Sequence, residues 1–416
     1  MNVAARSLSS LDLQRADESA ARSPTRADAA GQVELQLITD RRDFDALEDD
    51  WNDLFQRAGR PTHVFQSFNL CWHWANHHLT SEGGASALKL SIVTGRRNGR
   101  LIMIWPLASE RVRGITQTFW MGEPVVQYGD ALIAAEPDAP AILRAGLDFL
   151  RTQTSSDLLR LRRVREDANV APLMTEAGAR VADRQTAPYM DLASAKDFAR
   201  FEERYSSKMR RNRRRLSRRL EEKGPVEFVR LHGGAEARTL AARAIAVKSE
   251  WLKDRGLVSH AFADEKTARL FADLAEGKTK PVPCVVSALK ANGEIAALEV
   301  SFTCKGRLVI HVMAFDLEYE KSGVGVLLLE ENLKQGYAEG LSTYDMMAPG
   351  DPYKLDWCDK SDGVCDWVKP VSAKGYLYAR IYLGFLRSRL KSALKAMPQP
   401  MRRLMRKGYD ASATEN

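Results

Sequence analysis

Cysteines are few in this sequence of 416 residues, and none is spaced for a metal site or a redox pair. The five lie at positions 71, 284, 304, 358 and 365, without a CxxC pair and without a histidine at metal-ligand spacing. No apolar run approaches the roughly 20 residues that cross a bilayer, and residues 1–30 have no apolar signal-peptide core. These absences predict free thiols, no metal, a cytoplasmic location and a disordered leader over residues 1–30.

Acidic residues are absent from two segments. Residues 208–219 hold eight Lys and Arg, and the segment from Lys374 to Lys407 holds ten. Removing these 18 from the total of 62 basic residues leaves 44, against 54 Asp and Glu in the whole chain. The rest of the protein is therefore acidic, and the net charge of +8 comes from two short segments. Such asymmetry predicts an anionic partner at those segments.

The stretch from Leu308 to Lys354 carries the most informative pattern. It predicts a strand over residues 308–316, a glycine loop over 320–325, an apolar helix to about residue 339 and a strand over 342–347. Glycines at 323 and 325 allow backbone N–H groups to approach one anion, and the helix N-terminus adds partial positive charge. No Lys-Ser/Thr pair follows, so the loop is not of the Walker type. We expect a diphosphate to be held by Lys321, Ser322, Gly323, Val324, Gly325 and Val326.

Two Asn-Gly turns, at Asn98-Gly99 and Asn292-Gly293, lie between apolar runs and predict two β-hairpins. Each predicted hairpin is followed by a further strand, a helix and a last strand. This repetition indicates a duplication, and chance similarity of two hairpins is the alternative. Only the second copy has the glycine loop, because residues 125–130 of the first copy contain a single glycine.

The order of three strands, glycine loop, helix and strand resembles the GNAT N-acetyltransferase superfamily, whose loop is usually written Q/R-x-x-G-x-G/A. Glu320, Gly323 and Gly325 occupy the matching positions, and Glu320 departs from the usual Gln or Arg. Tandem domains with one donor loop are similar to the FemAB/FemX group and, more closely, to bacterial acyltransferases related to the cellulose-biosynthesis protein CelD. The matching features over residues 33–385 are Trp51, Phe65-Gln66-Ser67, Ser207-Lys208-Met209-Arg210, Lys248, Trp251, Gly256, Asp345, Gly350, Tyr353 and Lys354.

The resemblance implies an α/β (α+β) fold with two tandem GNAT-like domains, each a mixed, mainly antiparallel sheet flanked by helices. The expected divisions are a leader (1–30), a degenerate first domain (31–195), a basic helical connector (196–235), a donor-binding domain (236–373) and a basic amphipathic tail (374–416). It implies acyl transfer from acyl-coenzyme A, such as acetyl-coenzyme A, to an amine or hydroxyl. The acceptor would be a sugar, glycolipid or other small molecule of an exopolysaccharide, cellulose or envelope pathway.

The same resemblance implies roles for individual residues. A splayed strand at Ala314 and Phe315 would offer a backbone N–H to the acyl carbonyl. The expected catalytic residues are Asp345, Tyr353 and Lys354, and the expected acceptor-binding residues are Lys248, Trp251 and His311. Structural alternatives stay open: Asp345 as a carboxylate that fixes Tyr353 or Lys354, the Tyr353-Lys354 pair as packing, and His311 as a core histidine.

Two other functions remain open at this point. Glu320 places a carboxylate where the diphosphate would bind, so the chain could be a non-catalytic scaffold at the inner membrane. A FemX-like transferase would instead use aminoacyl-tRNA, bound by the basic helix over residues 208–219. That helix has no aromatic residues for base stacking, which makes nucleic acid the less favoured partner.

The tail has apolar residues at steps of three and four, with basic residues between them. This pattern predicts an amphipathic helix and a peripheral contact with anionic lipid, and a helix docked on the domain is the alternative. The apolar positions are Leu383, Leu386, Leu390, Leu394 and Met397.

Overall fold

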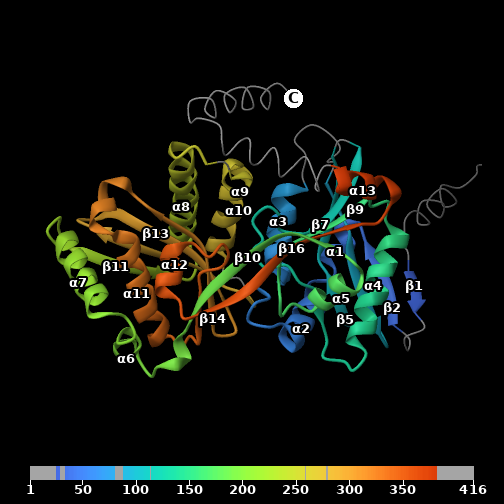
Figure 1. The fold of residues 1–416 in the computed structure, drawn as a ribbon, viewed down its shortest axis with the longest axis horizontal. Coiled ribbons are helices and arrows are strands. Elements are labelled where there is room, and N and C mark those ends of the chain that lie inside the picture. Colours follow the sequence, from blue (N-terminus) through green and yellow to red (C-terminus); the bar gives the residue numbers. More distant parts are fainter. Residues whose placement is uncertain are drawn as a thin grey trace, which may run out of the picture.

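The molecule has two halves, each with strands flanked by helices, which lie side by side along its longest axis (Figure 1). The structure is a computed structural model, and it describes residues 25–28, 33–79, 88–112, 114–257, 259–277 and 280–381. A five-stranded sheet and an eleven-stranded sheet are both mixed or antiparallel, with antiparallel pairs in the majority. This architecture confirms the predicted fold class.

The first half begins before the predicted domain, because a short strand lies within the expected leader and pairs with the next strand. The strands of this half are β1 (Thr25–Asp28), β2 (Val33–Ile38), β3 (Leu88–Leu90), β4 (Ile92–Arg97), β5 (Arg100–Trp105), β6 (Leu107–Val112), β7 (Ile115–Trp120), β8 (Leu132–Ile133), β9 (Leu158–Arg165) and β10 (Arg180–Asp191). Its helices are α1 (Arg41–Asp45), α2 (Glu48–Ala58), η1 (Val64–Gln66), α3 (Phe68–His78), α4 (Ala139–Gln153) and α5 (Val170–Glu176). The rest of the predicted leader lies outside the described residues.

The second half follows a short helical connection. Its strands are β11 (Val226–Leu231), β12 (Cys284–Ala291), β13 (Glu294–Cys304), β14 (Arg307–Phe315), β15 (Thr343–Asp345) and β16 (Lys360–Pro370). Its helices, with those of the connection, are η2 (Leu192–Ser194), α6 (Phe198–Glu202), α7 (Ser207–Glu221), α8 (Ala235–Asp254), α9 (His260–Ala263), α10 (Glu265–Glu276), η3 (Leu317–Ser322), α11 (Val324–Ala338), α12 (Pro352–Trp357) and α13 (Ala373–Tyr378). The predicted tail helix beyond residue 381 lies outside the described residues.

The two halves share one order of elements, as the two Asn-Gly turns predict. The order in the first half is a strand (β2), two main helices (α2 and α3), a hairpin that starts with β4, a helix (α4), a strand (β9), a short helix (α5) and the last strand (β10). The order in the second half is a strand (β11), two main helices (α8 and α10), the β12–β13 hairpin with β14, a helix (α11), a strand (β15), a short helix (α12) and the last strand (β16). Asn98 and Asn292 both have a φ of 51°, followed by glycines at 77° and 81°, which is the turn geometry that Asn-Gly favours. Both predicted hairpins are confirmed.

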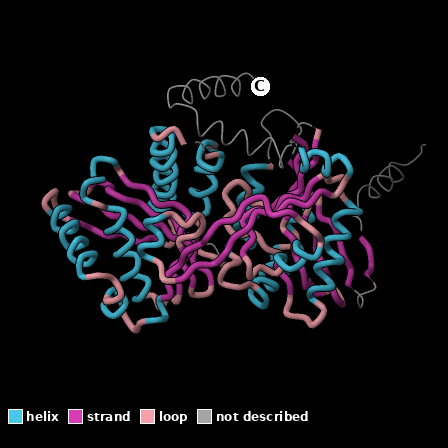
Figure 2. The backbone as a smooth tube through the Cα atoms, in the orientation of Figure 1, coloured by secondary structure: helices cyan, strands magenta, loops and turns pink. Residues whose placement is uncertain are grey.

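The halves exchange their last strands. β10 leaves the first half and lies between β15 and β16, while β16 returns from the second half to pair with β9. The two long strands run antiparallel to each other from Arg180 opposite Val368 to Tyr189 opposite Lys360. They cross the middle of the molecule and join both halves into the eleven-stranded sheet (Figure 1, Figure 2). The first half also has the five-stranded sheet to itself, but the larger sheet belongs to both halves, although the sequence predicts a linear series of domains.

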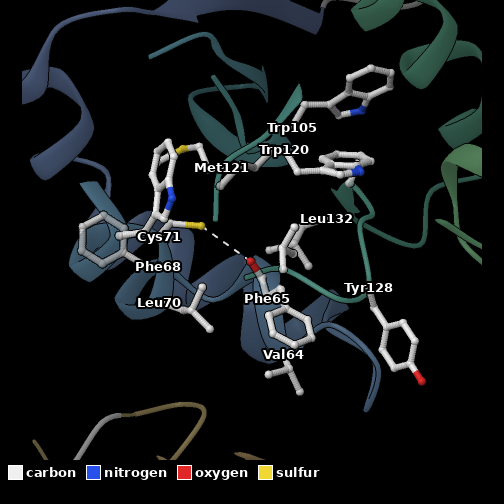
Figure 3. Packing of buried hydrophobic residues seen from close by; sticks show 14 of the residues in the cluster. Val64, Phe65, Phe68, Leu70, Cys71, Trp105, Trp120, Met121, Tyr128 and Leu132 are labelled. Atoms are coloured by element: carbon white, nitrogen blue, oxygen red, sulfur yellow. Dashed lines mark hydrogen bonds between the residues drawn. The ribbon is translucent and has the colours of Figure 1, made fainter. Parts of the chain in front are cut away.

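Buried aromatic side chains fill the first half. The indoles of Trp51, Trp74, Trp105 and Trp120 are at most 1% exposed, and the cluster continues around η1 and α3 (Figure 3). Each such side chain contributes on the order of 2 kcal/mol when removed from water. The Sγ of Cys71 lies 3.7 Å from the carbonyl of Phe65 and fixes the start of α3 (Figure 3).

Candidate active site

The pairing between the strands β14 and β15 ends early, and we refer to the unpaired region between them as the gap. The two strands are parallel and paired only at Arg307, Leu308 and Val309, opposite residues 343–345. Beyond Val309, β14 continues to Phe315 with no β15 partner among the described residues, and its register against β13 shifts by one residue at His311. Such a bulge bends a strand and increases its twist. Ala314 and Phe315 lie on the part of β14 beyond the last pair with β15, and their expected contact with an acyl carbonyl stays a prediction.

The glycine loop follows directly from the end of β14. Its first residues form the short helix η3, and Gly323 has a φ of 63° before α11 begins at Val324. The N–H of Gly323 donates to the carbonyl of Glu320, and the N–H of Val326 donates to the carbonyl of Gly323. The N–H groups of Val324 and Gly325 have no acceptor within the described residues, and at a helix start they point out of the helix. N–H groups at a helix start can bind an anion, and their expected contact with a diphosphate stays a prediction. The N–H of Val326, also expected there, is already satisfied within the loop.

The two glycines have different structural reasons. Gly323 adopts left-handed backbone, and a Cβ there would lie 2.7 Å from Leu216 Cδ1 of α7. A Cβ on Gly325 would meet only Met313 Sδ and Phe315 Cδ1, each at 3.7 Å. Gly323 therefore serves the fold, whereas the backbone of Gly325 would accept a Cβ, and a larger side chain there would extend toward the free part of β14.

The end of α8 lies beside the glycine loop. Lys248, Trp251 and Arg255 follow one another at helical spacing, with the ammonium nitrogen 4.5 Å and the guanidinium carbon 4.1 Å from the centre of the Trp251 ring. Arg255 Nη2 lies 3.4 Å from Glu320 Oε1 on the glycine loop. Burial lowers the pKa of Lys248, and the charge of Asp351 opposes this shift. Lys248, Trp251 and Arg255 thus form one stacked group. Arg255 contacts Glu320 in the loop after β14, and Lys248 is close enough to the loop after β15 to be influenced by the charge of Asp351.

Asp345 is fully buried. Its Oδ1 accepts hydrogen bonds from the Tyr128 hydroxyl and the Met347 N–H, both at 2.8 Å, and its Oδ2 accepts from Arg307 Nε at 2.8 Å. Tyr128 comes from the first half, so the carboxylate joins the two halves. The expected catalytic contact is not supported, because no part of Asp345 is exposed to a substrate. A structural role for Asp345 fits better. The residues that it holds are Tyr128, Arg307 and Met347, however, and not the expected Tyr353 or Lys354.

Lys354 and Tyr353 lie differently although they are adjacent. The ammonium of Lys354 donates to the carbonyls of Met347 and Pro349 at 3.1 and 3.0 Å, and burial lowers its pKa to about 8. Lys354 therefore fixes the loop between β15 and α12. Tyr353 is 51% exposed, and desolvation together with Asp351 raises its pKa to about 12. Of the three expected catalytic residues, Tyr353 alone has a side chain that a substrate can reach.

His311 lies at the bulge of β14 and faces the first half. Its Nε2 donates to the carbonyl of Val125 at 2.7 Å, and its ring lies 4.6 Å from that of Phe271. Burial lowers the pKa of His311 to about 4, so the ring is neutral at pH 7. This surrounding is that of a core histidine, and the expected acceptor contact stays a prediction.

Glu299 is a buried carboxyl that the sequence analysis missed. It lies on β13 at 0% exposure, its Oε2 accepts from the Tyr344 hydroxyl at 2.7 Å, and its Oε1 has no partner among the described residues. Burial raises its pKa to about 7. A glutamate within an otherwise apolar strand, with no basic neighbour in that strand, was the signal that could have identified it.

Comparison with known proteins finds similarity in family for part of the chain and in fold for most of it. Residues 207–355 match the family model of the acetyltransferase (GNAT) domain. The second half has the GNAT acetyltransferase fold. FemX is similar in structure, with a TM-score of 0.54 and 10% identity over 80% of this chain and 98% of that chain. A tandem GNAT protein from the clavulanic acid biosynthesis pathway has a TM-score of 0.46 and 13% identity over 82% of this chain and 99% of that chain.

Three further searches gave either no match for the sequence or no candidate among the described residues. The sequence has no significant match among curated proteins. Within the described ranges, no group of three or more His, Cys, Asp or Glu side chains could hold a metal ion. In the same part of the chain, no helix combines the length and the apolar character needed to cross a membrane.

Proposed function

We propose that the protein transfers an acyl group from the thioester of acyl-coenzyme A to an amine or hydroxyl of a second substrate. One observation carries this proposal: the unpaired part of β14 is followed directly by the loop that holds the N–H groups of Val324 and Gly325, which have no acceptor among the described residues. The N–H groups would hold phosphate, and the gap would take the extended arm of the donor. An acyl thioester on a phosphopantetheine arm has this combination of an anion and a long thin chain.

The chemistry needs positioning and two proton transfers. The nitrogen or oxygen of the acceptor attacks the thioester carbonyl, the C–S bond breaks, and the thiolate leaves. A proton leaves the acceptor, and a proton reaches the sulfur. Tyr353 is the candidate proton donor to sulfur, because its raised pKa of about 12 keeps the phenol protonated. Lys248 is the candidate proton acceptor, because burial lowers its pKa and favours the neutral amine.

Glu320 does not by itself argue for a scaffold without activity. Its carboxylate is paired with Arg255, so the loop does not present an uncompensated negative charge. Arg255 is also held against Trp251, which keeps a guanidinium beside the phosphate site. Arg255, at the end of α8, then supplies the positive charge that an Arg at position 320 would supply in a GNAT loop.

The acceptor class rests on the resemblance to CelD-like proteins alone. We propose a sugar or glycolipid of an exopolysaccharide, cellulose or envelope pathway, acylated on nitrogen or oxygen at the cytoplasmic side of the membrane. Contact of residues 374–407 with anionic lipid stays a proposal of the same kind. Loss of vesicle binding after removal of residues 391–416 would support it, and unchanged binding would exclude it.

The donor proposal is tested with Gly325→Val. The added side chain points toward Met313 and Phe315 and would fill the entrance of the gap. Gly336→Ala, in the same helix but with its Cβ 3.4 Å from Leu341, is the matched control. We expect saturable binding of acetyl-coenzyme A by the unchanged protein and by the control, and its loss in Gly325→Val with an unchanged circular dichroism spectrum. Equal binding by both variants would reject the site, and a folded protein without binding would favour the scaffold.

A further inference from the structure

The outer face of α7 carries six exposed cations. None of them lies within 4.0 Å of a carboxylate in the described part of the chain, and no acidic residue interrupts the series. The six are Lys208, Arg211, Arg214, Arg215, Arg218 and Arg219. We refer to them as the α7 cationic face. Other exposed cations without an ion pair, such as Lys89, Arg111 and Arg180, occur singly on strands, whereas this face gathers six on one helix.

The helix that bears this face is firmly fixed. Arg213 points inward, is 4% exposed, and contacts Glu330 of α11 at 2.6 Å and Glu202 of α6 at 3.1 Å. Its guanidinium carbon also lies 5.1 Å from the ring centres of Tyr205 and Trp357. A loosely attached solvated helix would not need a buried ion pair and two aromatic contacts. The backbone beneath the cationic face is therefore ordered before any partner binds, which lowers the entropy cost of binding.

The helix α7 borders the glycine loop. Along α7, Arg213 is opposite Glu330 and Leu216 is opposite Gly323, while Lys223 just after the helix lies 3.5 Å from Glu318. The helix thus runs antiparallel to α11, and its second half flanks the glycine loop. Figure 1 shows α7 at the outer edge of the second half, beside α11. A large anionic group attached to the donor would lie against this face.

The α7 cationic face is longer and carries more charge than the binding of a single nucleotide requires. Fifteen helical residues extend about 22 Å, and the six cations outnumber the phosphates of coenzyme A. The exposed side chains of α7 include no aromatic residue on which bases could stack. Leu317 is an apolar side chain, 47% exposed in η3, and the adjacent Glu318 pairs with Lys223 just after α7. An apolar contact with a charged rim is typical of protein–protein interfaces.

We propose that α7 and Leu317 dock a small acidic carrier protein, which delivers the acyl group as a thioester on its own phosphopantetheine arm. The inference rests on the proposed function, because the arm uses the same gap. The phosphodiester of the arm occupies the site of the diphosphate at Val324 and Gly325. The acceptor displaces the thiol, the C–S bond breaks, and the carrier leaves with a free thiol that has taken up a proton. Coenzyme A remains a donor without the docking contacts.

The test is a charge reversal, Arg211→Glu, Arg214→Glu and Arg218→Glu, in the full chain. The control reverses three exposed basic residues of the first half that have no ion pair in the described residues: Lys89→Glu, Arg111→Glu and Arg180→Glu. Binding is measured by fluorescence anisotropy with a labelled bacterial acyl carrier protein that bears an acetylated phosphopantetheine arm. Acetyl-coenzyme A and a short duplex RNA are measured in parallel, at low and high salt.

We expect the α7 variant to bind the carrier at least tenfold more weakly, with a smaller salt dependence, and to bind acetyl-coenzyme A within twofold of the unchanged protein. The control should keep both affinities. The docking proposal is overturned if coenzyme A binds and the carrier does not, or if the variant loses only RNA binding. If neither donor binds to the folded protein, the proposed function itself is rejected.

Discussion

The pair of Arg255 and Glu320 gives a prediction with a defined pattern of signs. The two groups are 3.4 Å apart, with side chains 37% and 54% exposed. Solvent screening limits such a surface charge to about 0.5–1 kcal/mol, which is about two- to fivefold in Kd. Glu320→Gln should therefore tighten acetyl-coenzyme A binding two- to fivefold, because it removes a negative charge and releases the guanidinium. Arg255→Gln should weaken binding by a similar factor.

The double variant should bind about as tightly as the unchanged protein, because it removes one charge of each sign. Isothermal titration calorimetry at low ionic strength measures all three. At 1 M salt, where the screening length is about 3 Å, the differences should disappear. Glu265→Gln with Arg269→Gln removes an exposed pair of similar separation, 3.5 Å, on α10 and serves as control. Equal affinities of all variants at low salt would refute the argument that Arg255 contributes to the donor site.

Four further outcomes follow from the same contacts. Gly323→Ala should lower stability by at least about 1 kcal/mol, because its left-handed backbone disfavours a Cβ, whereas Gly325→Ala should keep the melting temperature. Arg213→Met should cost about 3 kcal/mol in urea unfolding, since it leaves two carboxylates without their partner. Glu299 keeps a proton in the folded state between its ordinary pKa of 4.5 and about 7, so stability falls as pH rises through this range, and Glu299→Gln should flatten that slope. The pH dependence from His311 has the opposite sign, because its pKa is lowered in the folded state. Stability falls as pH decreases from 6.5 to about 4, and His311→Gln should remove this loss.

Local signals in the sequence predicted local structure well. The Asn-Gly turns identified both hairpins because the two residues favour positive φ regardless of the rest of the fold. The strand before the glycine loop, predicted over residues 308–316, is observed as Arg307–Phe315. The basic helix, predicted over residues 208–219, is observed as Ser207–Glu221. The glycine loop follows its strand directly in the sequence, and the helix predicted after the loop over residues 320–325 is observed from Val324.

Contacts between distant segments were beyond the sequence. Nothing in residues 180–191 indicates that this strand continues into the other half, since the exchange of β10 and β16 depends on pairing across about 180 residues. The partner of Asp345 is Tyr128, 217 positions away, so its burial could not be read from its neighbours. Arg213 is surrounded by other arginines in the sequence, and only the packing of α7 on α11 distinguishes it from them.

Calorimetric titration of the full chain with acetyl-coenzyme A tests the central claim most directly, with Gly325→Val measured beside it. We predict saturable binding in the micromolar range that is common for enzyme substrates, competition by free coenzyme A, and loss of the signal in the variant. Absence of binding by the folded, unchanged protein would contradict the claim that the gap beside β14 is a thioester donor site.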